Sequence, residues 1–320
     1  MNKVVVVGAG AWGTALAIQA ARAGSTVDLV ARDPQAARQI DATRSNPRLP
    51  GMPLPPVVQV RTDISPDADL LIWAIPMQQI RASLLRFQPG PCPIVICAKG
   101  VETNTGLLPL EVVADVPRPG PAAVLSGPNF ALEVAKGLPA ASVVGTTDPA
   151  LRDLVRASLG SSTFRLYGNS DPVGVQLGGA AKNVVAIAAG AVIGAGLGEN
   201  ARAALVTRGL SEIRRLIVAQ GGQADTAMGL SGLGDLLLTC TGAASRNFSL
   251  GLALGSGQPL QAILAAATST IEGVATAKAL VARAASADLP ICRAVADLLD
   301  GVKTLEQAVE SLLSRPQRDE

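Results

Sequence analysis

Three glycines near the N-terminus have the spacing of a phosphate-binding turn. Gly8, Gly10 and Gly13 form a complete GxGxxG motif, which follows an apolar run at residues 3–7 and opens a helical stretch. The first glycine permits a tight turn, the second lets the backbone approach a pyrophosphate, and the third lets helix and strand pack closely. The exposed N–H groups and the helix dipole attract the anion. The motif predicts a dinucleotide site, although the same glycines could serve a tight turn alone.

The residue that reads the ribose of such a dinucleotide is expected about 20 residues further on, at the end of the second strand. That place holds Ala31 and Arg32, and Asp33 comes next. An acid there would bind the ribose 2′-hydroxyl, whereas an arginine suits a 2′-phosphate. Arg32 therefore favours NADP, with NAD as the second cofactor. The alternative is a surface arginine that pairs with Asp33.

Two further polar clusters follow apolar runs that are typical of buried strands. Lys99 and Gly100 come after residues 94–98, and Ser126-Gly127-Pro128-Asn129 follows residues 122–125 and starts a helix. Open α/β sheets bind ligands at the carboxyl ends of their strands. Both clusters are therefore candidates for ligand contact, and each taken alone could be an ordinary loop.

Lys182 lies in an apolar helical stretch, with Gly178, Gly179, Val185 and Ala186 at helical spacing from it. A lysine on such a face cannot be buried without a partner. The chain contains no histidine, so acid–base chemistry must use lysine, aspartate, glutamate, tyrosine or cysteine. Lys182 is thus a candidate proton carrier. The alternative is a lysine at the helix edge whose ammonium reaches water.

Three segments of the second half carry further polar groups. Gly229–Asp235 is a glycine-rich turn that leads an acid into an apolar run, and Ser245-Arg246-Asn247 follows soon after. Serine, asparagine and arginine together suit a phosphate group. Either segment could also be a capped helix connection. Ser269 and Glu272 have the spacing of a capping box, with Ser269 as the cap.

The elements that must position these groups change in kind along the chain. Short apolar runs alternate with helical stretches in the first half, which predicts a mostly parallel, doubly wound sheet. The predicted strands are residues 3–7, 26–30, 57–60, 70–75, 94–98, 122–125, 142–144 and 164–166, and the predicted helices include 11–23, 78–87 and 151–159. Beyond Gly168 the strand signals stop, and Ser170 or Asp171 can cap a helix. From there to about residue 313 the chain is predicted to be helical, with breaks at 194–198, 221–222, 229–234 and 255–257.

These patterns predict an α/β fold with two domains. Residues 1–168 form a Rossmann-type dinucleotide-binding domain, and residues 169–320 form an all-helical, substrate-binding domain. Residues 46–56 are predicted to be a long loop and residues 314–320 a frayed polar tail. The stretch 184–198 is apolar, but a membrane span needs about 20 residues. We therefore expect a buried core helix there and no membrane span.

Composition excludes several classes of function. The net charge is +2 and aromatic residues make up 2% of the chain, so the basic field and the stacking platforms of nucleic-acid binding are lacking. The four cysteines form no CxxC pair, which argues against an all-cysteine metal site and favours reduced thiols in the cytoplasm. The N-terminal apolar run is too short for a signal peptide, so no export is predicted.

Taken together, the motifs resemble the bacterial-type NAD(P)-dependent glycerol-3-phosphate dehydrogenase family, in the expected order over nearly the whole chain. The resemblance rests on seven segments: Gly8–Gly13 with Thr14–Ala17, Lys99-Gly100, Ser126–Ala131, Gly174–Asn183, Gly229–Thr241, Ser245–Asn247 and Glu272-Gly273. It implies hydride transfer between a nicotinamide and the central carbon of dihydroxyacetone phosphate, which gives sn-glycerol 3-phosphate, the backbone of phospholipids. Such an enzyme binds a small molecule and no nucleic acid, and it could form a homodimer.

The resemblance also implies a role for each matching position. Lys182 would be the catalytic proton carrier; burial would lower its pKa, and Asp235 would counter that. The substrate would be held by Lys99, Gly127, Asn129, Lys182, Asp235, Ser245, Arg246 and Asn247. The cofactor would be held by Gly8, Gly10, Ala11, Trp12, Gly13, Arg32, Lys99, Ala131, Arg246, Thr270 and Glu272, and no metal is implied. Asn129 stands where the family also has Thr or Ser, and Trp12 where it also has Tyr or Phe.

Two other functions compete with this one. Another reductase of the same architecture could act on a β-hydroxy acid or a sugar phosphate, but it would lack a reason for Ser245-Arg246-Asn247 beside Asp235. An NADP-binding regulator without catalysis would need no proton carrier, so Lys182 in an apolar helix argues against it.

Overall fold

The computed structural model describes residues 2–117, 120–284 and 287–315. The chain divides into two compact units, the first made of residues 1–99 and 108–176 and the second of residues 100–107 and 177–320. Residues 316–320 of the predicted polar tail lie outside the described part.

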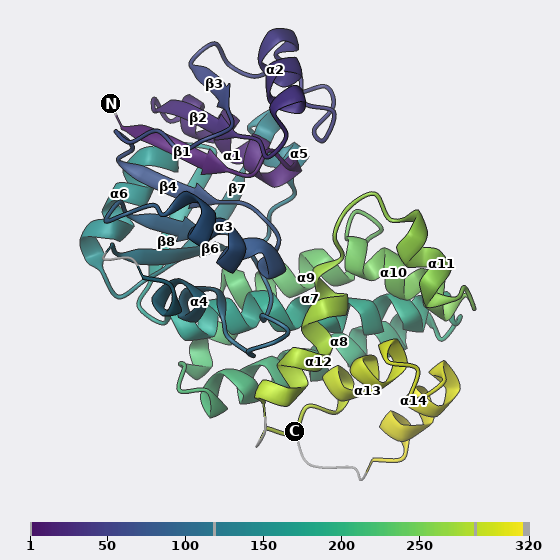
Figure 1. Ribbon diagram of the computed structural model, residues 1–320. Helices are drawn as coiled ribbons and strands as arrows, with labels where there is room; N and C mark the ends of the chain where they lie inside the picture. The colour runs from purple at the N-terminus through teal and green to yellow at the C-terminus, as the bar shows by residue number, and fades with distance from the viewer. Residues whose placement is uncertain (1, 118–119, 285–286, 316–320) are drawn as a thin grey trace. The chain divides into compact units, whose positions relative to one another are not determined.

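The first unit is built on an eight-stranded sheet in the order β3-β2-β1-β4-β5-β6-β7-β8 (Figure 1). The strands are β1 (Lys3–Val7), β2 (Thr26–Val30), β3 (Val58–Arg61), β4 (Leu70–Trp73), β5 (Ile94–Ile96), β6 (Ala122–Ser126), β7 (Ala140–Gly145) and β8 (Phe164–Asn169). β6 and β7 run antiparallel, and the other neighbouring strands are parallel. The prediction of a mostly parallel sheet from apolar runs is confirmed.

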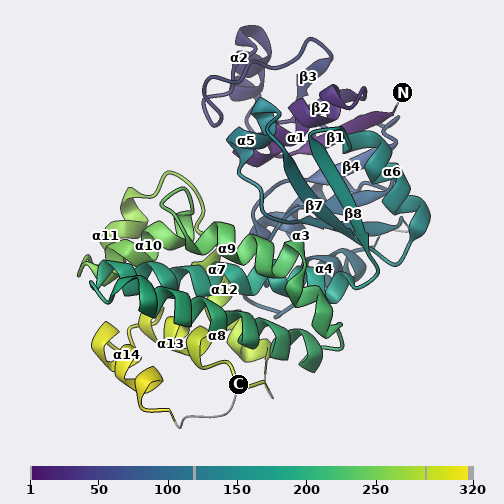
Figure 2. The same cartoon turned by 180° about the vertical axis from the view of Figure 1, so that it is seen from behind.

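Helices cover both faces of this sheet. They are α1 (Ala11–Arg22), α2 (Pro34–Thr43), α3 (Ile80–Phe87), α4 (Pro109–Asp115), α5 (Ala131–Lys136) and α6 (Pro149–Leu159). Figures 1 and 2 show α3 and α4 on one face and α5 and α6 on the other. Asp33 caps α2 and Asp148 caps α6, and each is followed by a proline at the first helical position. These caps fix where the helices begin, because they satisfy N–H groups that have no partner within the helix.

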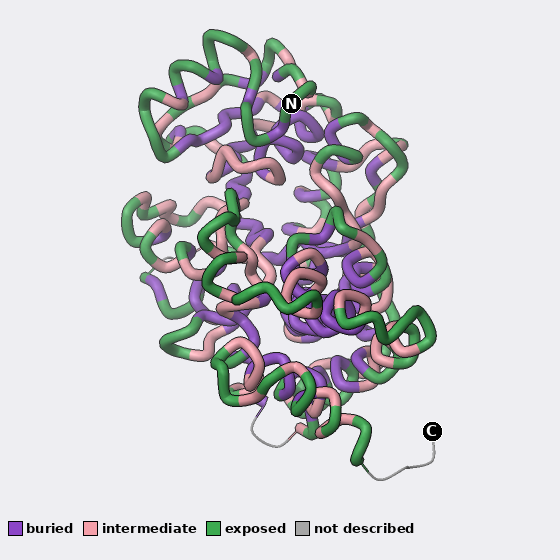
Figure 3. The backbone as a smooth tube through the Cα atoms, turned by 90° about the vertical axis from the view of Figure 1, so that its right-hand side faces the viewer, coloured by how far each residue is buried: buried purple, intermediate pink, exposed green. Residues whose placement is uncertain are grey.

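The second unit is helical. It contains most of α7 (Pro172–Gly194), then α8 (Gly198–Ala219), α9 (Asp235–Cys240), α10 (Arg246–Gly255), α11 (Leu260–Ala266), α12 (Glu272–Arg283), α13 (Pro290–Leu299) and α14 (Leu305–Leu313). α7 is apolar and long enough to cross a membrane by length and composition, but 83% of its most apolar window is buried in the protein. Figure 3 shows buried backbone within the helical half of the chain and more exposed backbone around it. α7 is the core helix that the sequence predicts.

Glycines bring the backbones of α7 and α10 into direct contact. A Cβ on Gly190 would overlap the carbonyl oxygen of Phe248, and a Cβ on Gly251 would overlap that of Ile187. Gly194 and Gly255, one turn further along each helix, are equally crowded by the partner helix. Both helices thus carry a GxxxG spacing at their contact, which permits close approach of two backbones.

A buried carboxylate joins two further helices of this unit. Glu212 on α8 accepts hydrogen bonds from the backbone N–H groups of Ile291 (2.6 Å) and Cys292 (3.1 Å) in the first turn of α13. Burial raises the pKa of the Glu212 carboxyl above its ordinary value, and the two N–H groups partly counter that rise. α13 has no side-chain cap at its own N-cap residue, Leu289. Glu212, which is 79 and 80 positions from these two residues, therefore supplies the cap that the local sequence lacks.

The helix contact gives a first prediction. Gly251→Ala should lower the melting temperature, because the new methyl group meets the backbone of α7 and overpacking costs about 1–3 kcal/mol. Intrinsic propensity argues the other way, since alanine is favoured over glycine inside a helix by about 0.5–1 kcal/mol. Gly242→Ala, at a position with open space, is the control. A thermal unfolding curve by circular dichroism in which Gly251→Ala matches or exceeds the unsubstituted protein contradicts this account.

Candidate active site

The turn between β1 and α1 has the shape that a dinucleotide requires. Gly8 has a φ of +113°, and a Cβ there would lie 2.6 Å from the carbonyl oxygen of Ala74. A Cβ on Gly13 would overlap the carbonyl oxygen of Gly8, so the third glycine is needed for close packing of helix on strand. Nothing in the protein lies within 4 Å of a Cβ built on Gly10. The turn is therefore tight where it meets the protein and open where a pyrophosphate would approach the helix N-terminus, so its residues fit the cofactor.

Ala11 and Trp12 are the first two residues of the helix that follows, α1. Trp12 packs against the core of the first unit, and its side chain hydrogen-bonds the Cys97 thiol. Burial raises the pKa of Cys97 to about 12, so this thiol stays protonated at neutral pH.

Arg32 and Asp33, which follow β2, have different functions in the structure. Asp33 accepts a hydrogen bond from the backbone N–H of Gln35 (2.9 Å) and so caps α2. The Arg32 side chain is exposed, and within the described part of the chain it has no hydrogen bond or ion pair. The alternative of an Arg32–Asp33 surface pair is therefore wrong, and the arginine remains available to a ligand.

Lys99 and Gly127, predicted from separate motifs, lie together at neighbouring strands of the sheet. The Lys99 ammonium donates to the Gly127 carbonyl oxygen at 3.0 Å. Gly127 has a φ of +142°, and a Cβ there would lie 3.0 Å from the Ala141 carbonyl oxygen. Only glycine fits this close approach to β7, so the loop after β6 is held against its neighbour strand.

Asn129 in the same loop carries an unsatisfied acceptor. Its amide nitrogen donates to the Ser142 hydroxyl (2.7 Å) and the Ala141 carbonyl oxygen (3.2 Å), which fixes the orientation of the amide. Its oxygen is buried and has no hydrogen-bond partner in the described part of the protein, and the same holds for the Ser126 hydroxyl. Buried polar atoms without a partner are rare. These two atoms point to a ligand that brings donors to the loop, just before Ala131 begins α5.

Lys182 is buried and paired, as its apolar surroundings demand. Its ammonium donates to the Asp235 carboxylate at 2.9 Å and to the Thr239 hydroxyl at 2.8 Å, and the two charged side chains are only 9% and 2% exposed. The alternative of a lysine that reaches water at the helix edge is wrong. The two contacts leave at most one of its three N–H groups for a substrate.

The segment before Asp235 is not the open turn that its glycines suggest. Residues Leu230–Gly234 form one turn of π-helix that leads directly into α9. A Cβ on Gly178 of α7 would lie 2.8 Å from the Ser231 carbonyl oxygen, so α7 contacts this turn through its backbone. The predicted break at 229–234 is therefore a helical junction, and it contacts α7 four residues before Lys182.

Cys240, at the end of α9, is the other reactive group close to this pair. Burial raises the pKa of its thiol to about 12, and the Lys182 charge only partly counters the rise. The thiol is protonated at neutral pH and is not a nucleophile there. Cys240 is therefore no candidate for the acid–base step, and Lys182 remains the candidate proton carrier.

Ser245, Arg246 and Asn247 begin α10 and are already engaged with the protein. The Ser245 hydroxyl caps the helix, and Arg246 donates to the Thr270 carbonyl oxygen at 2.6 Å. The Asn247 amide donates to the Asn183 side-chain oxygen (2.9 Å) and accepts from the Gly273 N–H (3.0 Å). One N–H of Asn247, the remaining donors of the Arg246 fork and the Ser245 O–H are left for an anion.

The prediction of a capping box at residues 269–272 is wrong. α12 begins at Glu272, and its N-cap is Ile271, which makes no side-chain cap bond. Gly273 instead lies against Asn247, where a Cβ would come within 2.6 Å of the amide oxygen. Thr270 and Glu272 are thus held next to Arg246 and Asn247 by the start of α12, not by a local cap.

The structure therefore gathers the predicted residues into two groups, one in each unit. The first unit holds Gly8, Gly10, Ala11, Trp12, Gly13, Arg32, Lys99, Gly127, Asn129 and Ala131, and the second holds Lys182, Asp235, Ser245, Arg246, Asn247, Thr270 and Glu272. Sequence reasoning missed Thr239 and Asn183. Their positions carried a signal, since Thr239 is one helical turn beyond Asp235 and Asn183 adjoins Lys182.

Comparison with known proteins decides the family. Family models described as the N-terminus and the C-terminus of NAD-dependent glycerol-3-phosphate dehydrogenase match residues 3–152 and 171–310. The chain belongs to this family. It is accordingly an NAD(P)-dependent oxidoreductase.

Individual relatives match this chain over nearly its whole length. Curated proteins named glycerol-3-phosphate dehydrogenase (NAD(P)+) from Acidiphilium cryptum and Gluconobacter oxydans are 54% and 50% identical; each match covers 98% of this chain and 97% of the relative. The crystal structure of glycerol-3-phosphate dehydrogenase from Coxiella burnetii superposes with a TM-score of 0.92 at 35% identity, covering 98% of this chain and 99% of that one. The predicted sequence resemblance and fold class are confirmed.

The open space at Gly10 gives a second prediction. Gly10→Ala should fold normally, with stability within about 1 kcal/mol, because its backbone is extended and its Cβ meets no protein atom. It should nevertheless weaken NADPH binding by about 1–3 kcal/mol, since the methyl group occupies the approach of the pyrophosphate. Gly13→Ala is the contrasting variant and should lose stability as well. Unchanged NADPH affinity of Gly10→Ala in a fluorescence titration would show that the pyrophosphate lies elsewhere.

Proposed function

We propose that this enzyme reduces dihydroxyacetone phosphate to sn-glycerol 3-phosphate, reversibly, with Lys182 as the proton carrier. The observation that carries the proposal is the buried pair of Lys182 and Asp235, with Thr239 as a second acceptor, in a chain of this family. Gly8, Gly10 and Gly13 would hold the pyrophosphate of the nicotinamide dinucleotide, which when bound would supply the hydride for the central carbon of the substrate.

The chain's own residues handle the proton. In the reductive direction the carbonyl oxygen gains negative charge, and the Lys182 ammonium stabilises that charge and transfers a proton to it. Asp235 holds the ammonium by a charge-assisted hydrogen bond, and Thr239 fixes its direction. No histidine is required, in keeping with its absence from the sequence.

The phosphate end of the substrate is assigned to the start of α10. The Arg246 guanidinium has several N–H donors, one of which binds the Thr270 carbonyl oxygen. Asn247 and Ser245 add neutral donors. Lys99, Gly127 and Asn129 are the proposed substrate contacts of the first unit; the unsatisfied Asn129 oxygen suits a hydroxyl of the substrate. Thr270, Glu272, Arg246 and Ala131 are proposed to contact the cofactor.

The setting of the reaction follows from its product and from the cysteines. Glycerol 3-phosphate is the backbone of phospholipids, so we assign the enzyme to glycerophospholipid supply. All four cysteines are free thiols, which supports a cytoplasmic location.

The apolar helical half supports a homodimer. We propose that residues 1–168 form the dinucleotide-binding domain and residues 169–320 the substrate-binding domain.

The proposed proton carrier gives a third prediction. Lys182→Ala should lower kcat by about 10²–10⁴-fold, the usual contribution of general acid catalysis, while NADPH still binds at the turn of the first unit. Lys278→Ala is the control, because that lysine is exposed and pairs with Asp300 at the surface. A variant that keeps more than about a tenth of the normal kcat, with chemistry rate-limiting, excludes Lys182 from this role.

Loss of the lysine also leaves Asp235 as an uncompensated buried charge, which is strongly destabilising. Lys182→Met combined with Asp235→Asn removes both charges and keeps the volume. Circular dichroism and NADPH titration of this double variant separate loss of catalysis from loss of folding. A substrate panel with and without phosphate, followed by NADPH absorbance, tests the rival substrates.

Cofactor choice gives a fourth prediction. NADPH should be used at least as well as NADH, because Arg32 is free to pair with a 2′-phosphate while Asp33 is committed to capping α2. Arg32→Ala should weaken NADPH by about 1.5 kcal/mol, the lower range for a charged bond at an exposed site, and NADH much less. The measurement is the ratio of kcat/KM for the two cofactors at one ionic strength. If the ratio does not move, Arg32 does not read the 2′-phosphate.

A further inference from the structure

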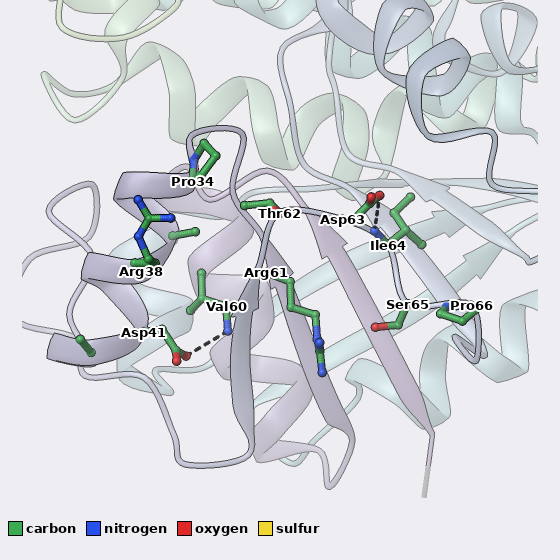
Figure 4. A pocket seen from close by; sticks show the side chains of 12 residues that line it. Pro34, Arg38, Asp41, Val60, Arg61, Thr62, Asp63, Ile64, Ser65 and Pro66 are labelled. Carbon is green, nitrogen blue, oxygen red and sulfur yellow. Dashed lines mark hydrogen bonds between the residues drawn. The ribbon is translucent and has the colours of Figure 1, made fainter.

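A cavity of about 620 Å³ lies in the first unit between α2 and the segment that follows β3 (Figure 4). Its walls come from α2, from the end of β3 and from residues 62–66. β2, which α2 follows, delivers Arg32 at its carboxyl end. The cavity is therefore lined by the helix that follows Arg32, the proposed ribose-reading residue, beginning with Pro34 at the first position of that helix.

Most charges around this cavity are already neutralised within the protein. Arg61 donates to the buried Asp28 carboxylate at 2.9 Å, and Asp28 also binds the Ser65 hydroxyl. Asp41 pairs with Arg44 at 2.9 Å and accepts from the Val60 N–H at 3.1 Å. Arg61, Asp41 and Ser65 line the cavity, and each is already paired within the protein.

Arg38 differs from them. It is exposed, it lines the cavity from α2, and among the described residues it has no hydrogen-bond or ion-pair partner. Figure 4 shows its side chain extending toward the turn of the helix that carries Pro34. Long helical side chains point back toward the N-terminus, and one turn rises about 5.4 Å. The guanidinium of Arg38 is thus directed to the same end of α2 as Arg32, which lies two residues before Pro34.

We propose that Arg38 is a second cofactor-specificity residue, and that Arg32 and Arg38 together hold the 2′-phosphate of NADP. The proposal rests on the proposed function only for the identity of the cofactor. A phosphate monoester carries about −1.5 to −2 charges near neutral pH, so one arginine leaves part of that charge uncompensated. A second guanidinium completes the neutralisation and adds a second fork of donors.

The remaining groups at the cavity mouth are consistent with this placement. Thr62 lies near Pro34 in Figure 4 and offers a hydroxyl. Asp63 lies on the other side of the mouth from Arg38, and its carboxylate accepts a hydrogen bond from the Ile64 N–H at 3.0 Å. The phosphate is therefore expected on the α2 side, where both unpartnered arginines originate.

The test compares two probes that differ only in the 2′-phosphate, 2′,5′-ADP and 5′-ADP, by isothermal titration calorimetry on the full chain. Arg38→Gln removes the charge but keeps a good helix former. It should weaken 2′,5′-ADP about tenfold and change 5′-ADP less than about twofold. Arg165→Gln is the matched control, because Arg165 is an exposed arginine on β8, at the opposite edge of the sheet from β3. The tenfold effect should shrink as ionic strength rises.

The outcomes separate this proposal from the proposed function. Equal weakening of both probes by Arg38→Gln, or no weakening of 2′,5′-ADP, overturns the role of Arg38, and so does failure of 2′,5′-ADP to bind the unsubstituted protein. The NADPH-dependent reduction of dihydroxyacetone phosphate is assayed on the same samples. Activity with an unresponsive Arg38 rejects only the present proposal, whereas selective loss of 2′,5′-ADP binding without any activity supports Arg38 and rejects the proposed substrate.

Discussion

An ammonium group inside an apolar helix is tolerated only where a carboxylate is held at hydrogen-bond distance, and the second unit is arranged around this constraint. Lys182 on α7 and Asp235 on α9 are 2.9 Å apart and almost fully buried. Such a pair repays its desolvation only when its geometry is excellent and further hydrogen bonds satisfy it, as Thr239 does here. A shift of α7 away from α9 would therefore leave two buried charges without their partners, which is strongly destabilising.

Glycines allow the close helix contacts around the Lys182–Asp235 pair. Gly178 lets α7 contact the π-helical turn before Asp235, and the crowded glycines Gly190 and Gly194 let the same helix contact α10 further along its length. A π-helical turn has one more residue per hydrogen-bonded ring than an α-helix, so it displaces the next residue from the regular register. The chain uses this displacement to direct Asp235 toward α7.

The parts of this structure that the sequence predicts well are those with strong local signals. The apolar runs predict the strands of the sheet to within a few residues, since parallel strands buried on both faces are continuous apolar runs. The sequence predicts the β1–α1 turn in detail, because each of its three glycines is required for a different steric reason. Lys182 was singled out for a physical reason, the cost of an unpaired buried charge. That its partner is Asp235 came only through the family resemblance.

What the sequence does not predict depends on contacts between distant residues. The cap of α13 comes from Glu212 on α8, and no local sequence pattern around Leu289 predicts it. The capping-box pattern at Ser269 was misleading for the converse reason: Asn247 binds the Gly273 N–H, so the start of α12 is satisfied from α10. The sequence of the π-helical turn predicts a loop because it is rich in glycine. In the structure a glycine of this turn, Gly232, allows close contact with the backbone of Ala227. In each case a tertiary contact replaces a local signal, and it does so mostly where the chain also places its functional groups. A site that must hold polar atoms ready for a ligand has to satisfy the surrounding backbone from elsewhere in the fold, so its local sequence is the least informative about its structure.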